Sequence, residues 1–309
     1  MRAAVRTDTG RRRRRNEDAY VCEPPLFAIA DGMGGAQAGE VASGLAAAVL
    51  AEDGGDERGE TRVRSLIQEA NRRVFRRSSE DAAASGMGTT MTVALVDAEA
   101  GTIAVGHVGD SRAYRIRGGA LEQLTEDHSL VGELHRSGQL SREEAEAHPQ
   151  RSVITRAVGT EPDVDVDVAT IPAEPGDLFL LCSDGLTDMV SDEEILALLE
   201  ESDDLDDAAS ALVDAANRGG GEDNITVVLF ELDGVDAQTP PQQPEPAVDD
   251  DEDTLSGLDP VPVVDTAVLP AAEPAPADED EHGRRLLPLL LLVVLLAAIA
   301  VLAIWGLTR

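Results

Sequence analysis

The sequence predicts an α+β fold in which helices pack on antiparallel sheets, followed by a C-terminal membrane-spanning helix. Three observations lead to this prediction. Runs of strand-forming residues are grouped together and do not alternate one by one with helical segments, which argues against a doubly wound parallel sheet. The short connections Asp97–Gly101 and Gly118–Gly119 are typical of antiparallel hairpins. A final stretch of 22 residues, 286–307, contains no charged side chain.

The individual elements follow from the spacing of the apolar residues. Alternating or continuous apolar runs rich in β-branched residues predict strands. These strands are expected at Leu26–Ala30, Thr90–Val96, Thr102–Val108, Ala113–Ile116, Asp165–Val168, Leu178–Cys182 and Ile225–Phe230, with a further short one at Ala19–Cys22. Apolar residues repeat at helical spacing between Val63 and Val74 and between Leu205 and Ala216, which predicts two amphipathic helices.

The charge composition excludes several classes of protein. The chain has 309 residues, 60 acidic and 25 basic side chains and a net charge of −35, and every basic residue is Arg. The absence of lysine excludes a Walker A loop, a kinase strand lysine and a Schiff-base enzyme. Nucleic-acid binding is not expected, because it depends on clustered cations and stacking aromatics, and aromatic residues make up only 2% of the chain.

The two cysteines, Cys22 and Cys182, lack the spacing of a zinc site or a disulfide framework, and they fit a reducing compartment. Cys182 ends an apolar strand, and Asp188 stands where a cysteine phosphatase would carry its Arg. Both thiols are therefore predicted to be packed in the core. The N-terminus is basic but has no apolar stretch, so no secretory signal is expected.

The chain divides into three segments of different character. Residues 1–232 carry mixed helix and strand patterns and are predicted to form the globular domain. Residues 233–283 contain 15 acidic residues, no Lys or Arg, and many Pro and Ala. Such a composition buries too little apolar surface to offset chain entropy, so a disordered acidic linker is expected. Residues 284–309 hold the apolar stretch.

The apolar stretch 286–307 is predicted to be a single-pass membrane anchor. At about 1.5 Å per residue it measures roughly 33 Å, which is enough to cross a bilayer core. Trp305 lies where an interfacial aromatic belongs, and a buried core helix of this length would carry a polar face. Arg284 and Arg285 precede the stretch, which predicts a cell-membrane protein with its globular domain in the cytosol.

Acidic residues stand at five junctions of the predicted strands, most of them next to glycine. They are Asp18 with its neighbour Glu17, Asp31, Asp110, Asp184 and Asp223. A single Asp-Gly pair is an ordinary turn, but the repeated arrangement indicates that these carboxylates come together. Adjacent carboxylates stay ionised only if cations neutralise them, and oxygen ligands suit Mg or Mn. Two such ions can activate water for attack on phosphorus.

Six short motifs follow one another in the globular segment. They are RRRNED at 13–18, DGMGG at 31–35, GTT at 88–90, VGDSR at 108–112, SDG at 183–185 and GEDN at 221–224. In this order they resemble the bacterial branch of the protein phosphatase 2C family of metal-dependent serine/threonine phosphatases, over residues 5–232. The resemblance implies a four-layer α-β-β-α sandwich, with two antiparallel sheets flanked by helices and two metal ions at one end.

The resemblance also implies the ligands of these two ions, which are Mn or Mg. Asp31 bridges both ions, and the Gly32 carbonyl binds one of them. Asp184 and Asp223 bind the other ion. The glycine beside Asp31 fits this role, because a residue without a side chain lets its carbonyl approach a metal closely.

Further roles are implied for residues around the two ions. Glu17 and Asp18 hold metal-bound water molecules, and Arg13, four residues before Glu17, holds the substrate phosphate. Asp110 helps to bind a third, weaker ion, and Ser152 is assigned to that same site.

The implied reaction is attack of a metal-bridging hydroxide on phosphoserine or phosphothreonine in a protein, without a phosphoenzyme. Met33 stands where animal members carry a His that is proposed as the general acid. A metal-bound water is therefore expected to protonate the leaving group. The expected partners are bacterial Ser/Thr kinases and their substrates, together with the membrane that holds the anchor.

Several alternatives stay open. The same fold would also suit a catalytically silent phosphoprotein-binding scaffold, a structural tether or a two-metal phosphodiesterase. Residues 125–155 resemble a substrate-selecting flap but equally fit a plain surface insertion. The Arg11–Arg15 run fits either contact with anionic lipid or a loop in which only Arg13 functions. The run Asp163–Val168 mimics a calcium loop, but Val168 replaces the required Gly, so it is predicted to be a strand.

Overall fold

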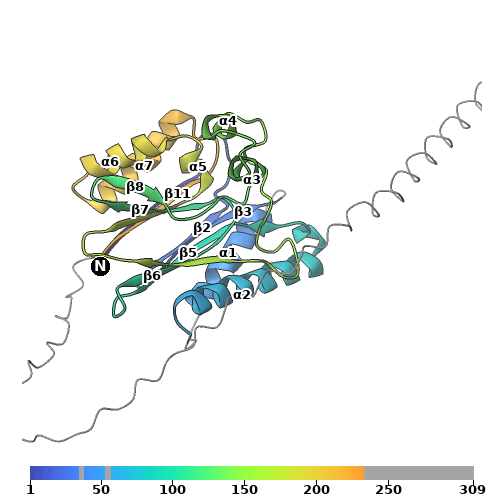
Figure 1. Cartoon of the computed structure of the whole chain (residues 1–309). Helices are drawn as coiled ribbons and strands as arrows, with labels where there is room; N and C mark the ends of the chain where they lie inside the picture. Colours follow the sequence, from blue (N-terminus) through green and yellow to red (C-terminus); the bar gives the residue numbers. More distant parts are fainter. Residues whose placement is uncertain (35–37, 53–56, 233–309) are drawn as a thin grey trace, which may run out of the picture. The chain divides into compact units, whose positions relative to one another are not determined.

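Two antiparallel sheets lie face to face, with helices on their outer faces (Figure 1). This arrangement is seen in a computed structural model that describes residues 1–34, 38–52 and 57–232. All nine recorded strand pairings are antiparallel. The predicted sandwich of antiparallel sheets is therefore confirmed for the described part of the chain.

The first sheet has the strand order β1-β11-β10-β7-β8. Its strands are β1 (Arg2–Asp8), β7 (Arg112–Arg117), β8 (Ala120–Gln123), β10 (Leu178–Cys182) and β11 (Ile225–Glu231). Strands β7 and β8 are joined by the predicted hairpin turn at Gly118–Gly119, where both glycines have positive φ. Strand β11 lies inside the sheet, because it pairs with both β1 and β10.

The second sheet has the strand order β2-β3-β5-β6-β9. Its strands are β2 (Asp18–Glu23), β3 (Leu26–Met33), β5 (Met91–Asp97), β6 (Thr102–Val108) and β9 (Asp167–Pro172), and the short β4 (Gly88–Thr89) pairs with the end of β3. The predicted turn at Asp97–Gly101 joins β5 to β6 as an antiparallel hairpin.

Helices cover each sheet from outside (Figure 1). The second sheet is covered by α1 (Ala38–Ala51) and α2 (Gly59–Glu80), which is followed by the short η1 (Ala82–Ala84). The first sheet is covered by α6 (Asp192–Glu201) and α7 (Leu205–Gly219), with the single turn α5 (Asp184–Thr187) directly after β10. Two further short helices, α3 (Leu130–Arg136) and α4 (Arg142–Glu146), lie between β8 and β9 in the chain.

The predicted strands and both amphipathic helices are present, with one shifted strand. Strand β9 begins at Asp167 and not at Asp165, because its pairing with β6 runs from Asp167 to Pro172. Helix α1 was not predicted, since Glu40 is its one charged residue and an almost wholly apolar helix has no clear period. The prediction of two core thiols holds for Cys182, but Cys22 is only half-buried because β2 is an edge strand.

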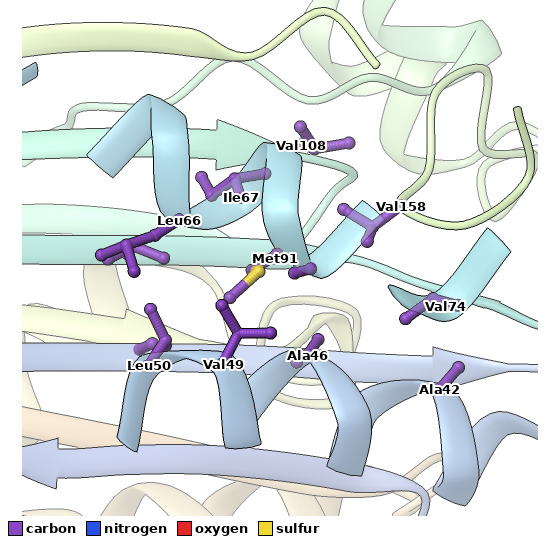
Figure 2. Packing of buried hydrophobic residues seen from close by; sticks show 14 of the residues in the cluster. Ala42, Ala46, Val49, Leu50, Leu66, Ile67, Val74, Met91, Val108 and Val158 are labelled. Atoms are coloured by element: carbon purple, nitrogen blue, oxygen red, sulfur yellow. The ribbon is translucent and has the colours of Figure 1, made fainter. Parts of the chain in front are cut away.

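Apolar side chains fill the space on both faces of each sheet. Figure 2 shows Met91 of β5 between Ala46 and Val49 of α1 on one side and Leu66 and Ile67 of α2 on the other. Small residues on α1 allow this close packing of the helix pair on the sheet.

Between the sheets, three of the four phenylalanines of the chain form a stack. The rings of Phe27 and Phe230 lie with their centroids 4.0 Å apart, and those of Phe179 and Phe230 lie 5.2 Å apart. Phe27 comes from one sheet and the other two from the opposite sheet, so the stack joins the two layers.

No helix within residues 1–34, 38–52 and 57–232 is long and apolar enough to cross a membrane. The predicted linker 233–283 and the predicted membrane span 286–307 lie outside the described residues. Both stay predictions.

Replacing Phe230 with Ala should destabilise the domain strongly. The side chain is fully buried and contacts both partner rings, so its loss is expected to lower the free energy of unfolding by about 3–5 kcal/mol. Urea denaturation of the variant measures this change. Tyr20→Ala is the matched control, because Tyr20 is 42% exposed and should cost about 1 kcal/mol or less. Equal losses in the two variants would contradict the role of the stack.

Candidate active site

The predicted carboxylates meet at one end of the sandwich. Asp18 at the start of β2 and Asp31 near the end of β3 are direct partners in the antiparallel register. Asp184 follows β10 and Asp223 precedes β11, and these two strands are neighbours in the other sheet. The strand junctions of both sheets therefore place their carboxylates around one site. Asp110, which follows β6, is also close enough to influence Asp31 and Asp184 electrostatically.

Burial and mutual repulsion make these carboxyl groups hard to ionise. Burial, followed by the charges of Asp18 and Asp184, raises the pKa of Asp31 well above its usual range. Burial, followed by Asp110 and Asp188, does the same to the pKa of Asp184. Burial raises the pKa of Asp18 to about 6 and that of Asp110 to about 7. Such a cluster needs positive charge to be ionised at neutral pH.

Unpartnered carboxylate oxygens show where that positive charge fits. Asp18 Oδ1, Asp110 Oδ1 and Asp184 Oδ1 are buried and have no hydrogen-bond partner within the described residues. A buried acceptor without a partner is costly, and three of them in one cluster point to a cation. The oxygen-only donor set is the one that Mg and Mn prefer.

The absence of a side chain on Gly39 leaves room beside Asp31 for the carbonyl oxygen of Gly32. A Cβ on Gly39, at the start of α1, would lie 2.7 Å from the Gly32 carbonyl oxygen and 2.7 Å from Glu17 Oε2. These two predicted ligand groups therefore converge beside Gly39. A side chain on Gly32 itself would meet the Gly39 carbonyl oxygen at 2.2 Å, so only glycine fits there.

The described residues do not contain three His, Cys, Asp or Glu side chains gathered tightly enough to form a complete metal cage. Mg and Mn do not require one, because they keep several water ligands and bind through one or two carboxylates each. The carboxylates around Asp31 fit such partly hydrated ions.

A second layer of hydrogen bonds orients the carboxylates. Ser183 Oγ and Thr226 Oγ1 donate to Asp18 Oδ2 at 3.0 and 2.6 Å. The Glu17 backbone N–H donates to Asn224 Oδ1 at 2.8 Å, and the Asp31 N–H donates to Thr90 Oγ1 at 3.0 Å. The sequence motifs contain Ser183, Asn224 and Thr90 but assigned them no role. No sequence pattern indicated Thr226, because nothing local shows which hydroxyl in a buried strand faces the site.

Arg13 reaches the site, as predicted for the residue that holds the substrate phosphate. Its guanidinium donates to Asp223 Oδ2, and half of its side chain is exposed. Burial lowers the pKa of Arg13, but the charge and hydrogen bond of Asp223 outweigh this effect, so the group stays charged. The guanidinium therefore lies at the rim of the cluster, where it can meet an incoming anion.

His128 holds the turn that carries Asp110, a role that no sequence motif indicated. The Gly109 backbone N–H donates to the ring nitrogen Nδ1 of His128 at 3.1 Å. The backbone N–H of His128 donates in return to the Gly109 carbonyl at 2.7 Å. The other ring nitrogen, Nε2, lies 3.0 Å from Asp167 Oδ2 and 3.0 Å from Arg156 Nη1. The ring also lies 4.8 Å from that of His107.

The two ends of the segment 125–155 are hydrogen-bonded to each other beside this turn. The Thr155 N–H donates to the His128 carbonyl, and the Leu130 N–H donates to the Val153 carbonyl, both at 2.8 Å. Arg151 pairs with Asp188 at 3.2 Å, which brings the segment to the carboxylate cluster. No hydrogen bond joins Ser152 to Asp110 in the part of the chain that the structure describes, so the assignment of Ser152 to a third metal stays a prediction.

An open hollow of about 550 Å³ lies apart from the carboxylates. Small apolar residues of β1, β2 and α1 line it, among them Ala3, Val5 and Ala48, and none of the predicted site residues does. Apolar hollows favour small organic ligands, whereas a phosphate on a protein requires charge at the surface. We therefore assign the chemistry to the carboxylate cluster.

The motifs and the geometry agree with the comparisons to known proteins. The family profile described as "Protein phosphatase 2C" matches residues 11–218. The chain belongs to the protein phosphatase 2C family. It is 42% identical over 245 residues to the serine/threonine phosphatase stp of Listeria monocytogenes, which covers 75% of this chain and 96% of that protein. It is 41% identical over 260 residues to PstP of Mycobacterium tuberculosis, of which it matches 50%.

Solved structures of protein phosphatase 2C relatives share the fold. A crystal structure of M. tuberculosis PstP matches with a TM-score of 0.71 and 40% identity, covering 75% of this chain and 98% of that one. The catalytic domain of PstP, solved in complex with two manganese ions, matches with a TM-score of 0.69, 37% identity and the same coverage. This family membership supports divalent metal ions as the cofactors, in agreement with the oxygen donors of the site.

Removing divalent cations should make this phosphatase 2C domain less stable as pH rises. Asp18 and Asp110 have folded-state pKa values of about 6 and about 7, above the usual 3.8, so their protonated forms stabilise the fold below pH 4. This stability is lost progressively as pH rises from about 4 to about 6 for Asp18 and to about 7 for Asp110, which amounts to roughly 3 and roughly 4 kcal/mol. Melting temperatures with EDTA should fall between pH 5 and pH 8, and Mn should restore them.

Asp110→Asn is the matched control for this pH dependence, because the amide cannot ionise. Its melting temperature in EDTA should fall less between pH 5 and pH 8 than that of the unchanged protein. A melting temperature that stays constant or rises over this range in EDTA would contradict the electrostatic account of the cluster.

Replacing His128 should weaken metal binding at Asp110. His128→Ala leaves the buried Gly109 N–H without an acceptor and frees the turn, which should lower the affinity for the third ion that the family resemblance implies at Asp110 by about 10- to 100-fold. His128→Asn keeps an acceptor near the position of Nδ1 and should lose less. Isothermal titration with Mn measures both affinities. Equal losses in the two variants would show that the Gly109 hydrogen bond is not what orients Asp110.

Proposed function

We propose that this chain hydrolyses phosphoserine and phosphothreonine in proteins with two divalent cations, Mn or Mg, held at the carboxylate cluster. Its family membership, together with relatives named serine/threonine phosphatases at about 40% identity, identifies it as a protein-serine/threonine phosphatase. The observation that carries the metal-dependent part is the group of buried oxygens on Asp18, Asp110 and Asp184 that have no partner within the described residues.

The proposed ligand set follows the placement of the oxygens. Asp31 lies at the centre, between Asp18 on its paired strand and Asp184 and Asp223 from the other sheet. The Gly32 carbonyl and Glu17 supply oxygens on the α1 side. When bound, the two ions would lower the pKa of water and neutralise the phosphate charge.

The side chains of this chain would position the reactants. Asp18, held by Ser183 and Thr226, keeps Oδ1 free to accept a hydrogen bond from a water molecule. Arg13 would exchange its contact with Asp223 for the substrate phosphate, to which a guanidinium can donate two parallel hydrogen bonds. Met33 has no proton to give, so the proton for the leaving oxygen is proposed to come from water in the site.

We further propose that residues 286–307 anchor the domain to the cell membrane from the cytosolic side, with residues 233–283 as the tether. The charge-free stretch and the acidic Pro- and Ala-rich segment before it support this proposal. Tethering would raise the effective concentration of the domain near membrane-bound partners, for which Ser/Thr kinases and their substrates are our candidates.

Phosphate release from a phosphothreonine peptide tests the proposed reaction. The full chain should release phosphate with Mn and stop when EDTA is added. Asp31→Asn should lower kcat by about a thousandfold or more, because Asp31 lies between the two predicted ion positions.

Two rival functions give different results in the same assay. A phosphoprotein-binding scaffold would bind the peptide with Mn present but release no phosphate. A phosphodiesterase would cleave bis(4-nitrophenyl) phosphate faster than 4-nitrophenyl phosphate. Either result, obtained with folded protein, would refute the proposed monoester hydrolysis.

Ending the chain at Leu232 tests the tether. The shortened protein should keep its activity on soluble phosphopeptides and should leave the membrane fraction for the soluble fraction. Loss of peptide hydrolysis would contradict the modular arrangement. Continued recovery of the shortened protein with membranes would contradict the anchor.

A further inference from the structure

Five consecutive arginines, Arg11–Arg15, form a turn at the rim of the active site, and the proposed mechanism uses only one of them. The domain that carries them, residues 1–232, is otherwise acidic, with 45 acidic and 22 basic side chains in all. A domain with this excess of negative charge repels acidic peptides, so a local group of cations beside the site changes which substrates can approach.

The arginine turn is built on the loop that carries Asp223. The Arg11 and Arg12 N–H groups both donate to the Gly221 carbonyl, at 2.7 and 3.2 Å. Asn224 Nδ2 donates to the Thr9 and Arg15 carbonyls, each at 2.9 Å, and so fastens both ends of the turn. The turn is therefore held in place next to the catalytic carboxylates, and little entropy is lost when it binds a ligand.

Three of the five side chains are already paired with acidic residues. Arg12 lies 3.5 Å from Glu222, Arg13 contacts Asp223, and Arg15 lies 3.4 Å from Glu40. Arg11 and Arg14 are exposed, and within the described residues their guanidinium groups have no hydrogen bond or ion pair. Two cations are thus left available on a rigid turn.

The position of the turn places these two cations beside a bound substrate. Arg13, between them in the chain, is the group assigned to the phosphate. Glu222 lies between Arg12 and Arg151 of the segment 125–155, at 3.5 and 4.0 Å, so the turn and that segment border the same site. A peptide whose phosphate meets Arg13 must therefore place its neighbouring residues near the arginine turn.

We propose that Arg11 and Arg14 form an anionic subsite that selects phosphopeptides with Asp or Glu close to the phosphorylated residue. A guanidinium fork binds carboxylates with two hydrogen bonds, and it is fully charged at any working pH. The proposal rests on the proposed phosphatase function and adds a substrate class to it. Because both side chains are exposed, the selection is weakened by salt.

Two phosphothreonine peptides test the subsite on the full chain with Mn. One carries Glu on both sides of the phosphothreonine, and the other carries Gln at the same positions. At low salt the unchanged protein should have a kcat/KM about three- to tenfold higher for the Glu peptide, mainly through KM. In the Arg11→Gln/Arg14→Gln variant this ratio should fall to about one, and in Arg11→Glu/Arg14→Glu the Gln peptide should be preferred.

Arg76→Gln is the matched control, because Arg76 is also without a partner in the described part of the chain and lies on helix α2 and not on the arginine turn. It should leave the ratio unchanged. A ratio of one in the unchanged protein, or a ratio that survives both double substitutions, would overturn the subsite. Absence of phosphate release from both peptides would instead refute the phosphatase function.

Vesicle flotation separates this proposal from binding of lipid headgroups. If the arginine turn serves a membrane surface, the Arg11→Gln/Arg14→Gln variant loses its preference for phosphatidylserine over phosphatidylcholine vesicles while the peptide ratio stays as in the unchanged protein. That pair of results would overturn the peptide subsite. A changed peptide ratio with unchanged vesicle binding supports it.

Discussion

Repulsion among buried carboxylates is the constraint on which the rest of this structure depends. Asp18, Asp31, Asp110 and Asp184 raise one another's cost of ionisation at one end of the sandwich. A fold that gathers them loses stability unless cations bind there. The same energetic cost provides the affinity for metal, because each ion relieves several unfavourable contacts at once.

The two-sheet sandwich supports this arrangement from both sides. Antiparallel pairing brings the end of one strand beside the start of the next, so acidic residues at strand ends meet without long loops. The stack of Phe27, Phe230 and Phe179 joins the sheets, so that the two halves of the site, one from each sheet, keep their separation. Hydroxyl groups from Ser183 and Thr226 then cross from one sheet to Asp18 on the other.

Around this rigid centre, the groups that would meet a substrate come from loops. Arg13 and the free arginines beside it stand on a turn fastened by Asn224, and Arg151 approaches from the segment 125–155. A charged rim on a fixed turn suits recognition of a short stretch of protein better than the apolar hollow beside β1 and β2. Chemistry and selection are therefore divided between the strand ends and the loops.

The sequence by itself predicted eight of the eleven strands in the described residues, all except β1, β4 and β8, together with the two amphipathic helices, the types of ligand and the family, because each depends on local spacing or on short motifs. Strands β6 and β10 begin and end where predicted, and Asp31, Asp184 and Asp223 were expected together. It did not reveal α1, whose almost wholly apolar surface has no period, or the start of β9, which is set by pairing with β6.

Only the tertiary structure decided which distant side chains meet. The contacts of Thr226 with Asp18 and of His128 with Gly109 join residues far apart in the chain, and no local pattern encodes them. The same holds for the arginine run, since the sequence shows five equal cations. The structure pairs three of them with acidic partners from elsewhere in the chain and leaves Arg11 and Arg14 available, because those partners are placed by long-range packing.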